Sequence, residues 1–199
     1  MPKDPLKAFE KRIWGAPDGE NKPVLAATVI LLRDGTEGLE TLMLRKNSKI
    51  VFGGMWVFPG GRIDVNDGAP DASAEEKARH AAVREAKEEA ALVLDPTKLL
   101  WFSHWTPPAM GNKRFITWFF AAQAPDETVT IDDGEITASQ WLRPGEALTK
   151  QKEGEIEVVP PTYVTLHYLS QYPDVRATGQ NPLYHYLRYG QDEGRKPRP

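Results

Sequence analysis

The stretch of the chain with the most chemical potential is "AAVREAKEEAALVL", residues 81–94, in which one arginine and three glutamates fall within six positions. On a helix, positions i, i+3 and i+4 share one face, so Glu85, Glu88 and Glu89 are expected to project together. Like charges placed this way repel, and without a cation they destabilise a helix by roughly a few tenths of a kcal/mol per pair. A charge run of this kind is usually a solvated helix face, and the alternative is a metal site.

The sequence before this helix favours the metal site. "FPGG", residues 58–61, ends an apolar stretch and begins the loop that leads to the helix. Glycines allow the backbone to approach a metal or a phosphate closely. Clustered carboxylates suit Mg²⁺, which takes oxygen ligands and usually shares its shell with water and substrate phosphates. We therefore predict a phosphate and magnesium site, with Mn²⁺ as the other metal that such ligands accept.

Composition restricts the other classes of function. The chain has 199 residues and a net charge of -3, so no basic excess indicates a nucleic-acid polymer or an anionic membrane as partner. It has no cysteine, which excludes disulfides, thiolate zinc sites and a cysteine nucleophile. Its N-terminal residues lack the apolar core of a secretory signal, and its longest apolar run is far below the ~20 residues that cross a bilayer. We expect a cytoplasmic protein.

The elements around the helix predict an α/β fold. A capping box, Ser73 with Glu76, predicts that the helix begins there, and Pro96 that it ends near Leu94. Segments rich in β-branched, aliphatic and aromatic residues predict strands, and two segments that begin with proline predict further helices. The strands are expected at 24–32, 39–45, 55–58, 99–105, 114–123, 128–131 and 134–142, and the later helices at 144–154 and 160–172. The first two strands are expected to pair as a hairpin across "RDGTEG".

These motifs resemble the Nudix hydrolase family. Its characteristic box is Gly, five residues, Glu, seven residues, then Arg-Glu-aliphatic-x-Glu-Glu-x-Gly-aliphatic. Glu76, seven intervening residues and "REAKEEAAL" match the second half in register, and Gly61 resembles the opening glycine. Gly61 lies nine residues further from Glu76 than the box allows, which we interpret as an insertion in a loop, at 65–72. A second departure is Ala91, which stands where the family has glycine.

The resemblance implies a fold and a metal site. The fold is an α/β/α sandwich with a mixed β-sheet and a catalytic loop and helix, to which this chain adds a short helical C-terminal tail. The reaction is attack of water on a diphosphate attached to a group X, with Mg²⁺ between protein carboxylates and substrate oxygens. The implied metal ligands are Gly61, through its carbonyl, and Glu85, Glu88 and Glu89.

The resemblance also implies catalytic residues. Arg84 would orient Glu85 by a charge-assisted hydrogen bond. Glu135, six residues before Trp141, corresponds to a functional glutamate near the family's late strand, as a distal ligand or a general base. The general base is left unassigned, because related enzymes use different glutamates. Glu76 has either a catalytic role or only the structural role of pairing with Ser73.

For the substrate, the sequence is most similar to the acyl-coenzyme A diphosphatase branch of the family, which also carries an insertion inside the box. Arg45 matches the first of two arginines in the coenzyme A signature, but Ile50 stands where the second should be. Arg114 could supply a cation for phosphate instead. The alternatives are hydrolysis of ADP-ribose, NADH or dinucleoside polyphosphates, and a ligand sensor without catalysis.

The tyrosine-rich C-terminal residues differ in composition from the rest. We expect a Nudix domain at 1–172 and a short appendage at 173–199, with helical turns near 182–189. Exposed tyrosines suit an interface, so a homodimer is the protein partner to test, beside the small-molecule diphosphate substrate.

Overall fold

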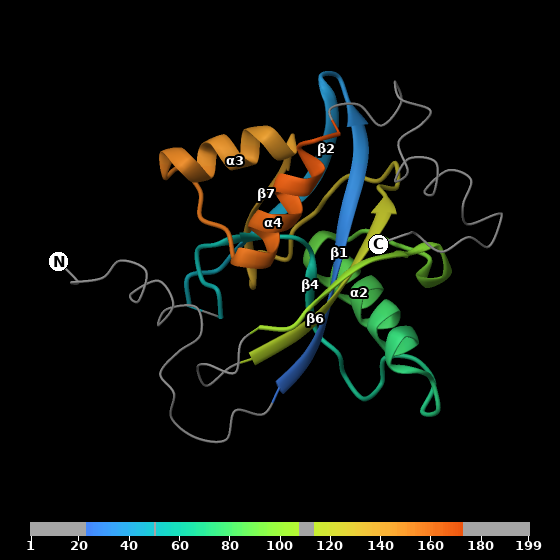
Figure 1. The fold of residues 1–199 in the computed structure, drawn as a ribbon. Helices are drawn as coiled ribbons and strands as arrows, with labels where there is room; N and C mark the ends of the chain where they lie inside the picture. Colours follow the sequence, from blue (N-terminus) through green and yellow to red (C-terminus); the bar gives the residue numbers. More distant parts are fainter. Residues whose placement is uncertain (1–22, 50, 108–113, 173–199) are drawn as a thin grey trace.

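A mixed sheet of seven strands forms the centre of the protein, whose computed structural model describes residues 23–49, 51–107 and 114–172. The strands are β1 (Pro23–Gly35), β2 (Gly38–Lys46), β3 (Trp56–Val57), β4 (Gly60–Arg62), β5 (Leu100–Trp105), β6 (Arg114–Gln123) and β7 (Ile136–Leu142). The helices are α2 (Ala74–Ala90), α3 (Pro144–Glu153) and α4 (Pro160–Leu169), with a 3₁₀ turn, η1, at Pro96–Lys98. Figure 1 shows their arrangement along the chain.

The strand order explains why the sheet is mixed. The order is β3-β2-β1-β6-β5, while β4 also pairs with β1 and β7 with β2. β1 and β2 form the predicted antiparallel hairpin, with Gly35 opposite Gly38. β1 and β6 run parallel over ten residue pairs, and the other named strand pairs are antiparallel.

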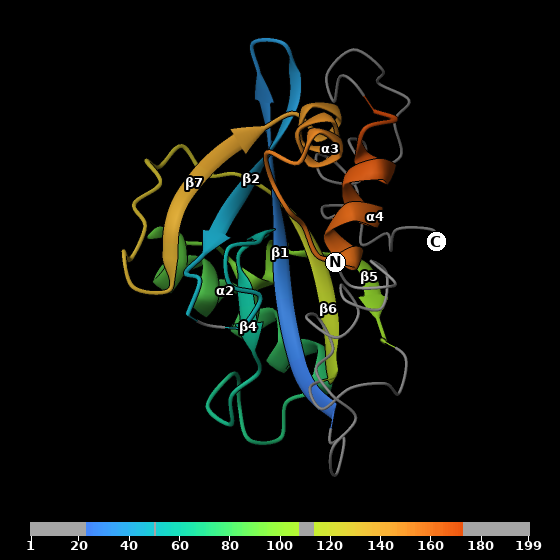
Figure 2. The ribbon, with the colours of Figure 1, turned by 90° about the vertical axis from the view of Figure 1, so that its left-hand side faces the viewer.

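Helices cover both faces of this sheet, as expected for an α/β/α sandwich. Side chains of a strand alternate between its faces. On β1, Val29 and Leu31 belong to the apolar cluster under α2, whereas Ile30 and Leu32 belong to the cluster under α3 and α4. In Figure 1, α3 and α4 lie on one side of β1 and α2 on the other, and in the turned view of Figure 2 α2 passes behind β1.

Helix α2 begins where the capping box predicts but ends earlier than expected. The hydroxyl of Ser73 accepts the backbone N–H of Glu76, and the Glu76 carboxylate accepts the N–H of Ser73. The helix ends at Ala90, not near Leu94, because Ala91 takes the left-handed conformation with φ 57°. Glycine is favoured at such a C-cap. The family's glycine is therefore explained by this backbone conformation, which Ala91 adopts despite its methyl group.

Two other expectations for the fold need correction. Residues 128–131 form no strand, and Thr130 only donates its backbone N–H to Ala90. Conversely, "GGR" at 60–62 forms β4, which brings the glycines against β1. Ile50 and the predicted appendage at 173–199 lie outside the described residues. No helix in the described part of the chain is long and apolar enough to span a membrane.

Candidate functional site

The predicted acidic face of α2 lines a cavity of about 640 Å³. β4 and the end of β2 form one side of it, and the start of α4 forms another. The charged residues of the lining, which we call the charged end, are Lys46, Arg62, Asp64, Arg84, Glu85, Glu88, Glu89, Asp132 and Glu135. The apolar residues of the lining, which we call the apolar end, include Val51, Phe52, Val57, Trp105, Phe115, Phe119, Val159, Pro160 and Pro161. The cavity can therefore hold a molecule with both a charged and an apolar part.

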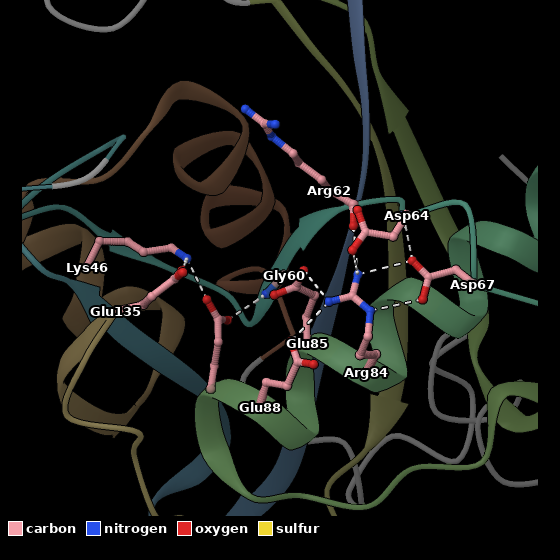
Figure 3. A network of polar contacts seen from close by, with 10 residues as sticks. Lys46, Gly60, Arg62, Asp64, Asp67, Arg84, Glu85, Glu88 and Glu135 are labelled. Atoms are coloured by element: carbon pink, nitrogen blue, oxygen red, sulfur yellow. Dashed lines mark hydrogen bonds and ion pairs between the residues drawn. The ribbon is translucent and has the colours of Figure 1, made fainter.

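Arg84 organises the charged end from α2. Its Nε and one terminal nitrogen donate to the two oxygens of Asp67, each at 3.0 Å. Its other terminal nitrogen donates to Glu85 at 2.9 Å and to Glu88 at 3.0 Å (Figure 3). Burial tends to raise the pKa of Asp67, but hydrogen bonds from Arg84 and from the Asp64 backbone outweigh it and lower the pKa. The bonds to Asp67, opposed by burial, raise the pKa of Arg84, which stays charged.

Glu85 lies against β4. A Cβ atom placed on Gly61 would lie 2.3 Å from Oε1 of Glu85, so only glycine leaves room for this carboxylate. Burial raises the pKa of Glu85, and the hydrogen bond from Arg84 opposes that rise. A carboxylate whose pKa is raised is a stronger proton acceptor than an ordinary carboxylate.

Glu89 is the most buried of the three helix glutamates, with a side chain 4 % exposed. Its Oε1 accepts from Nζ of Lys46 at 2.5 Å and its Oε2 from the backbone N–H of Gly60 at 2.9 Å. Burial raises the pKa of Glu89 to about 7, although Lys46 and the Gly60 amide act in the opposite direction. Each oxygen of this carboxylate therefore has a protein donor.

Glu135 enters the cavity from the loop before β7, on the side of Lys46 (Figure 3). Its carboxylate lies 3.8 Å from Nζ of Lys46, and its side chain is 64 % exposed. The loop is fixed by Asp132, which accepts the backbone N–H groups of Glu135 and Ile136, and by Asn47, which donates to the Gly134 carbonyl. The sequence-predicted Glu135 is thus held at the same cavity as the helix glutamates.

The carboxylates of the site match a divalent metal in the kind of donor atom that they offer. Within residues 23–49, 51–107 and 114–172, no group of three or more His, Cys, Asp or Glu side chains is arranged to hold a metal ion as it stands. Instead, the carboxylates form ion pairs with protein cations: Glu85 and Glu88 pair with Arg84, and Glu89 pairs with Lys46. The donors themselves are carboxylate oxygens on one cavity beside a glycine backbone, which is the chemistry that Mg²⁺ requires. The donor atoms therefore suit Mg²⁺, and the cations that they contact in this structure are Arg84 and Lys46.

Neither arginine predicted to bind the substrate lines this cavity. Arg45 lines a second cavity, of about 410 Å³, with Trp56 and Lys150. Alternation along β2 explains this, because Leu44 faces α2 and its neighbour Arg45 faces the opposite side of the sheet. Arg114, at the start of β6, donates to the carbonyl of Pro107 and is absent from the lining. The predicted role of Arg45 at the diphosphate is therefore not supported by its position.

Sequence reasoning missed Lys46, Arg62, Asp64 and Asp132 of the cavity lining, and also Asp67, the partner of Arg84. Lys46 follows Arg45 and shares the α2-facing side of β2 with Leu44, a signal present in the alternation of "LMLRK". Asp67 lies six residues after Gly61, which is the spacing of the first glutamate in the family's box. Asp67 pairs with Arg84, whereas Glu76 pairs with Ser73 and does not line the cavity. The nine extra residues therefore follow the acidic position of the box, and Glu76 caps the helix.

The comparisons with known proteins agree with this geometry. A protein-family model described as the NUDIX domain matches residues 22–161. No curated protein matches the chain. A solved NUDIX hydrolase from Alicyclobacillus acidocaldarius is similar, with a TM-score of 0.66, 22% identity, and 78% of this chain and 95% of that one covered.

Two further solved structures are named for a ligand or a substrate. The NUDIX domain of Shewanella oneidensis NrtR, complexed with ADP ribose, has a TM-score of 0.55 at 16% identity, with 83% of this chain and 96% of that one covered. A C. elegans Ap4A hydrolase has a TM-score of 0.51 at 20% identity, with 74% and 96% covered. At these identities the likeness concerns the fold.

Proposed function

Because the chain belongs to the Nudix family, by a domain match that spans residues 22–161, we propose that it hydrolyses a diphosphate linkage in a nucleoside diphosphate-X substrate with a divalent metal. The observation that carries the proposal is the meeting of Glu85, Glu88 and Glu89 with Gly61 at one cavity. A bound Mg²⁺ would neutralise diphosphate charge and polarise its oxygens. Glu85, Glu88 and Glu89 would hold it, and Mn²⁺ is the second metal to test.

The other charged residues bind and orient. Arg84, anchored by Asp67, positions Glu85 and Glu88 through hydrogen bonds of 2.9 and 3.0 Å. Arg62 lines the same cavity and supplies a cation for substrate phosphate. We assign no single general base and keep two candidates for the acceptor of the proton of the attacking water: Glu85, whose pKa burial raises, and Glu135, which is exposed in the cavity. Single glutamine variants at these two positions separate their roles through kcat and its pH profile.

For the group X, coenzyme A and acyl-coenzyme A are our first candidates. The apolar end of the cavity, which includes Phe52, Trp105 and Phe115, gives a hydrocarbon or pantetheine group a surface to contact. The position of Arg45 removes one of the reasons for this choice, and Ile50 removes another. ADP-ribose, NADH and dinucleoside polyphosphates are therefore kept as alternatives, since similar folds include an ADP ribose complex and an Ap4A hydrolase. A ligand sensor is the non-catalytic alternative.

A turnover screen tests this proposal. The protein is incubated with Mg²⁺ and each of coenzyme A, an acyl-coenzyme A, ADP-ribose, NADH and a dinucleoside polyphosphate, and products are identified by mass spectrometry. The control is the double variant Glu88→Gln, Glu89→Gln. Release of a 4'-phosphopantetheine product by the wild type alone supports the coenzyme A choice, and cleavage of another substrate retains the chemistry but discards that choice. Binding of a panel member without cleavage supports the sensor.

A further inference from the structure

The Lys46 side chain occupies a cation position inside the carboxylate cluster. Its Nζ donates to Oε1 of Glu89 at 2.5 Å and lies 3.8 Å from Oε2 of Glu135. The side chain is only 11 % exposed, although a lysine at the end of a strand could extend into solvent. In Figure 3, the Lys46 ammonium points toward the Glu135 carboxylate at the left-hand side of the network. One positive group therefore joins a helix glutamate to the loop before β7.

Glu89 cannot gain a divalent cation easily while this contact persists. Its Oε2 accepts from the Gly60 amide, which belongs to β4 and is fixed by pairing with Thr28 on β1. Its Oε1 is the oxygen that Lys46 contacts. An ammonium group this close to Oε1 repels a divalent cation on the same oxygen, and the low exposure of the pair leaves that repulsion poorly screened. Metal and ammonium thus compete for Oε1.

We propose that Lys46 is a displaceable counter-cation: it pairs with Glu89 in the metal-free protein, leaves Oε1 when the metal binds, and then contacts the diphosphate. This inference rests on the proposed function. Lys46 then positions the Glu89 carboxylate before the metal binds and contacts the substrate afterwards.

The geometry near Lys46 provides for both states. Lysine carries three rotatable donors on a flexible stem, so its ammonium can move without a change in the strand. Lys46 lines the same cavity as Arg62 and Glu85, so an ammonium released from Glu89 stays at the charged end. In the metal-free state it offsets the charge of Glu89, whose side chain is 4 % exposed and costly to leave unpaired.

The test measures metal affinity without substrate. MnCl₂ is titrated calorimetrically into the wild type, Lys46→Gln and Lys87→Gln. Glutamine at position 46 can still donate a hydrogen bond to Glu89 but carries no charge. Lys87→Gln is the matched control, because Lys87 lies on the same helix as Glu89, is exposed and does not line the cavity. We expect Lys46→Gln to bind Mn²⁺ about tenfold more tightly than Lys87→Gln, at the lower end of effects produced beside metal ligands.

The substrate should respond in the opposite direction. With the substrate found in the turnover screen, Lys46→Gln should raise KM more than it changes kcat, since a phosphate contact is lost. Lys46→Arg, which keeps the charge, should bind Mn²⁺ with an affinity close to that of the wild type. A purely structural anchor would behave differently, because loss of Lys46 would disorder Glu89 and weaken both Mn²⁺ and substrate binding.

The outcomes separate this inference from the proposed function. Thermal denaturation first confirms that each variant is folded. If Lys46→Gln is unfolded, Lys46→Met, which also removes the charge, takes its place, and displacement then requires that it bind Mn²⁺ about tenfold more tightly than Lys87→Gln. An Mn²⁺ affinity of Lys46→Gln equal to or weaker than that of Lys87→Gln, in a protein that binds Mn²⁺ and turns over, overturns the displacement alone. Absence of both Mn²⁺ binding and turnover in the wild type overturns the proposed function as well.

Discussion

Replacing Gly61 with alanine should impair the site and leave the fold intact. The added Cβ would lie 2.3 Å from Oε1 and 2.5 Å from Cδ of Glu85, whereas ordinary contact begins at 3.4 Å. The carboxylate must therefore move by about 1 Å, and a misplacement of that size can lower turnover about 100-fold. The carboxylate ends a flexible side chain, and Gly61 has no positive φ, so we expect a change in unfolding free energy within about 1 kcal/mol.

Two other glycine-to-alanine variants serve as controls for Gly61→Ala. A Cβ on Gly145 meets nothing within 4 Å, so Gly145→Ala should preserve both stability and turnover. A Cβ on Gly60 would lie 2.5 Å from the Ala27 carbonyl oxygen and 2.7 Å from Cα of Thr28. Backbone atoms cannot move aside as a side chain can, so Gly60→Ala should lose stability as well as activity.

The assay combines steady-state kinetics on the substrate found in the turnover screen with urea denaturation. For Gly61→Ala we expect a large fall in kcat with an almost unchanged denaturation midpoint. If kcat stayed within twofold of the wild type, the close approach of Gly61 to Glu85 would not matter for catalysis. If the stability fell as far as for Gly60→Ala, the residue would be structural, and either result would refute the reasoning.

Three further changes test the remaining contacts. Asp67→Asn removes the negative charge from the partner that anchors Arg84 through two hydrogen bonds, so we expect a loss of about 2 kcal/mol in urea denaturation and a fall in turnover. Unchanged turnover would contradict the orienting role. Ser73→Ala removes the helix cap, so it should cost about 1 kcal/mol and leave kcat unchanged, whereas a fall in kcat would give the cap a part in catalysis. Burial raises the pKa of Glu89 from 4.5 to about 7, so between these two pH values the folded metal-free protein holds a proton there that the unfolded chain has lost. The free energy of unfolding should therefore decrease as the pH rises from about 4.5 to 7, by at most about 3 kcal/mol. In Glu89→Gln this free energy should depend less on pH. Equal pH dependences in the two proteins would exclude Glu89 as the source.

Local features of the chain explain what could be predicted. Ser73 and Glu76 are three residues apart, so they define the start of α2 without help from the rest of the fold. The glutamates follow at helical spacing from there, which places them on one face. The end of the helix was harder to predict, because alanine at position 91 gives no signal for the left-handed conformation that it adopts.

Pairs of residues that are distant in sequence explain what could not be predicted. The spacing of Asp67 from Gly61 is visible in the sequence, but only the fold brings its carboxylate to Arg84, 17 residues later. Lys46 and Glu89 are 43 positions apart, and the residues between them carry no local sign that the two side chains meet. Such contacts depend on how β2, β4 and α2 pack together.

The sequence by itself determined the helix, its acidic face and the resemblance to the Nudix box, because these depend on spacings within one element. The tertiary structure decided which basic residue at the end of β2 lines the cavity. Alternation places Arg45 and Lys46 on opposite faces of β2 in any structure, but only the packing of α2 against one face makes Lys46 the residue at the cavity. The physical reason is that a strand's two faces are equivalent until another layer covers one of them.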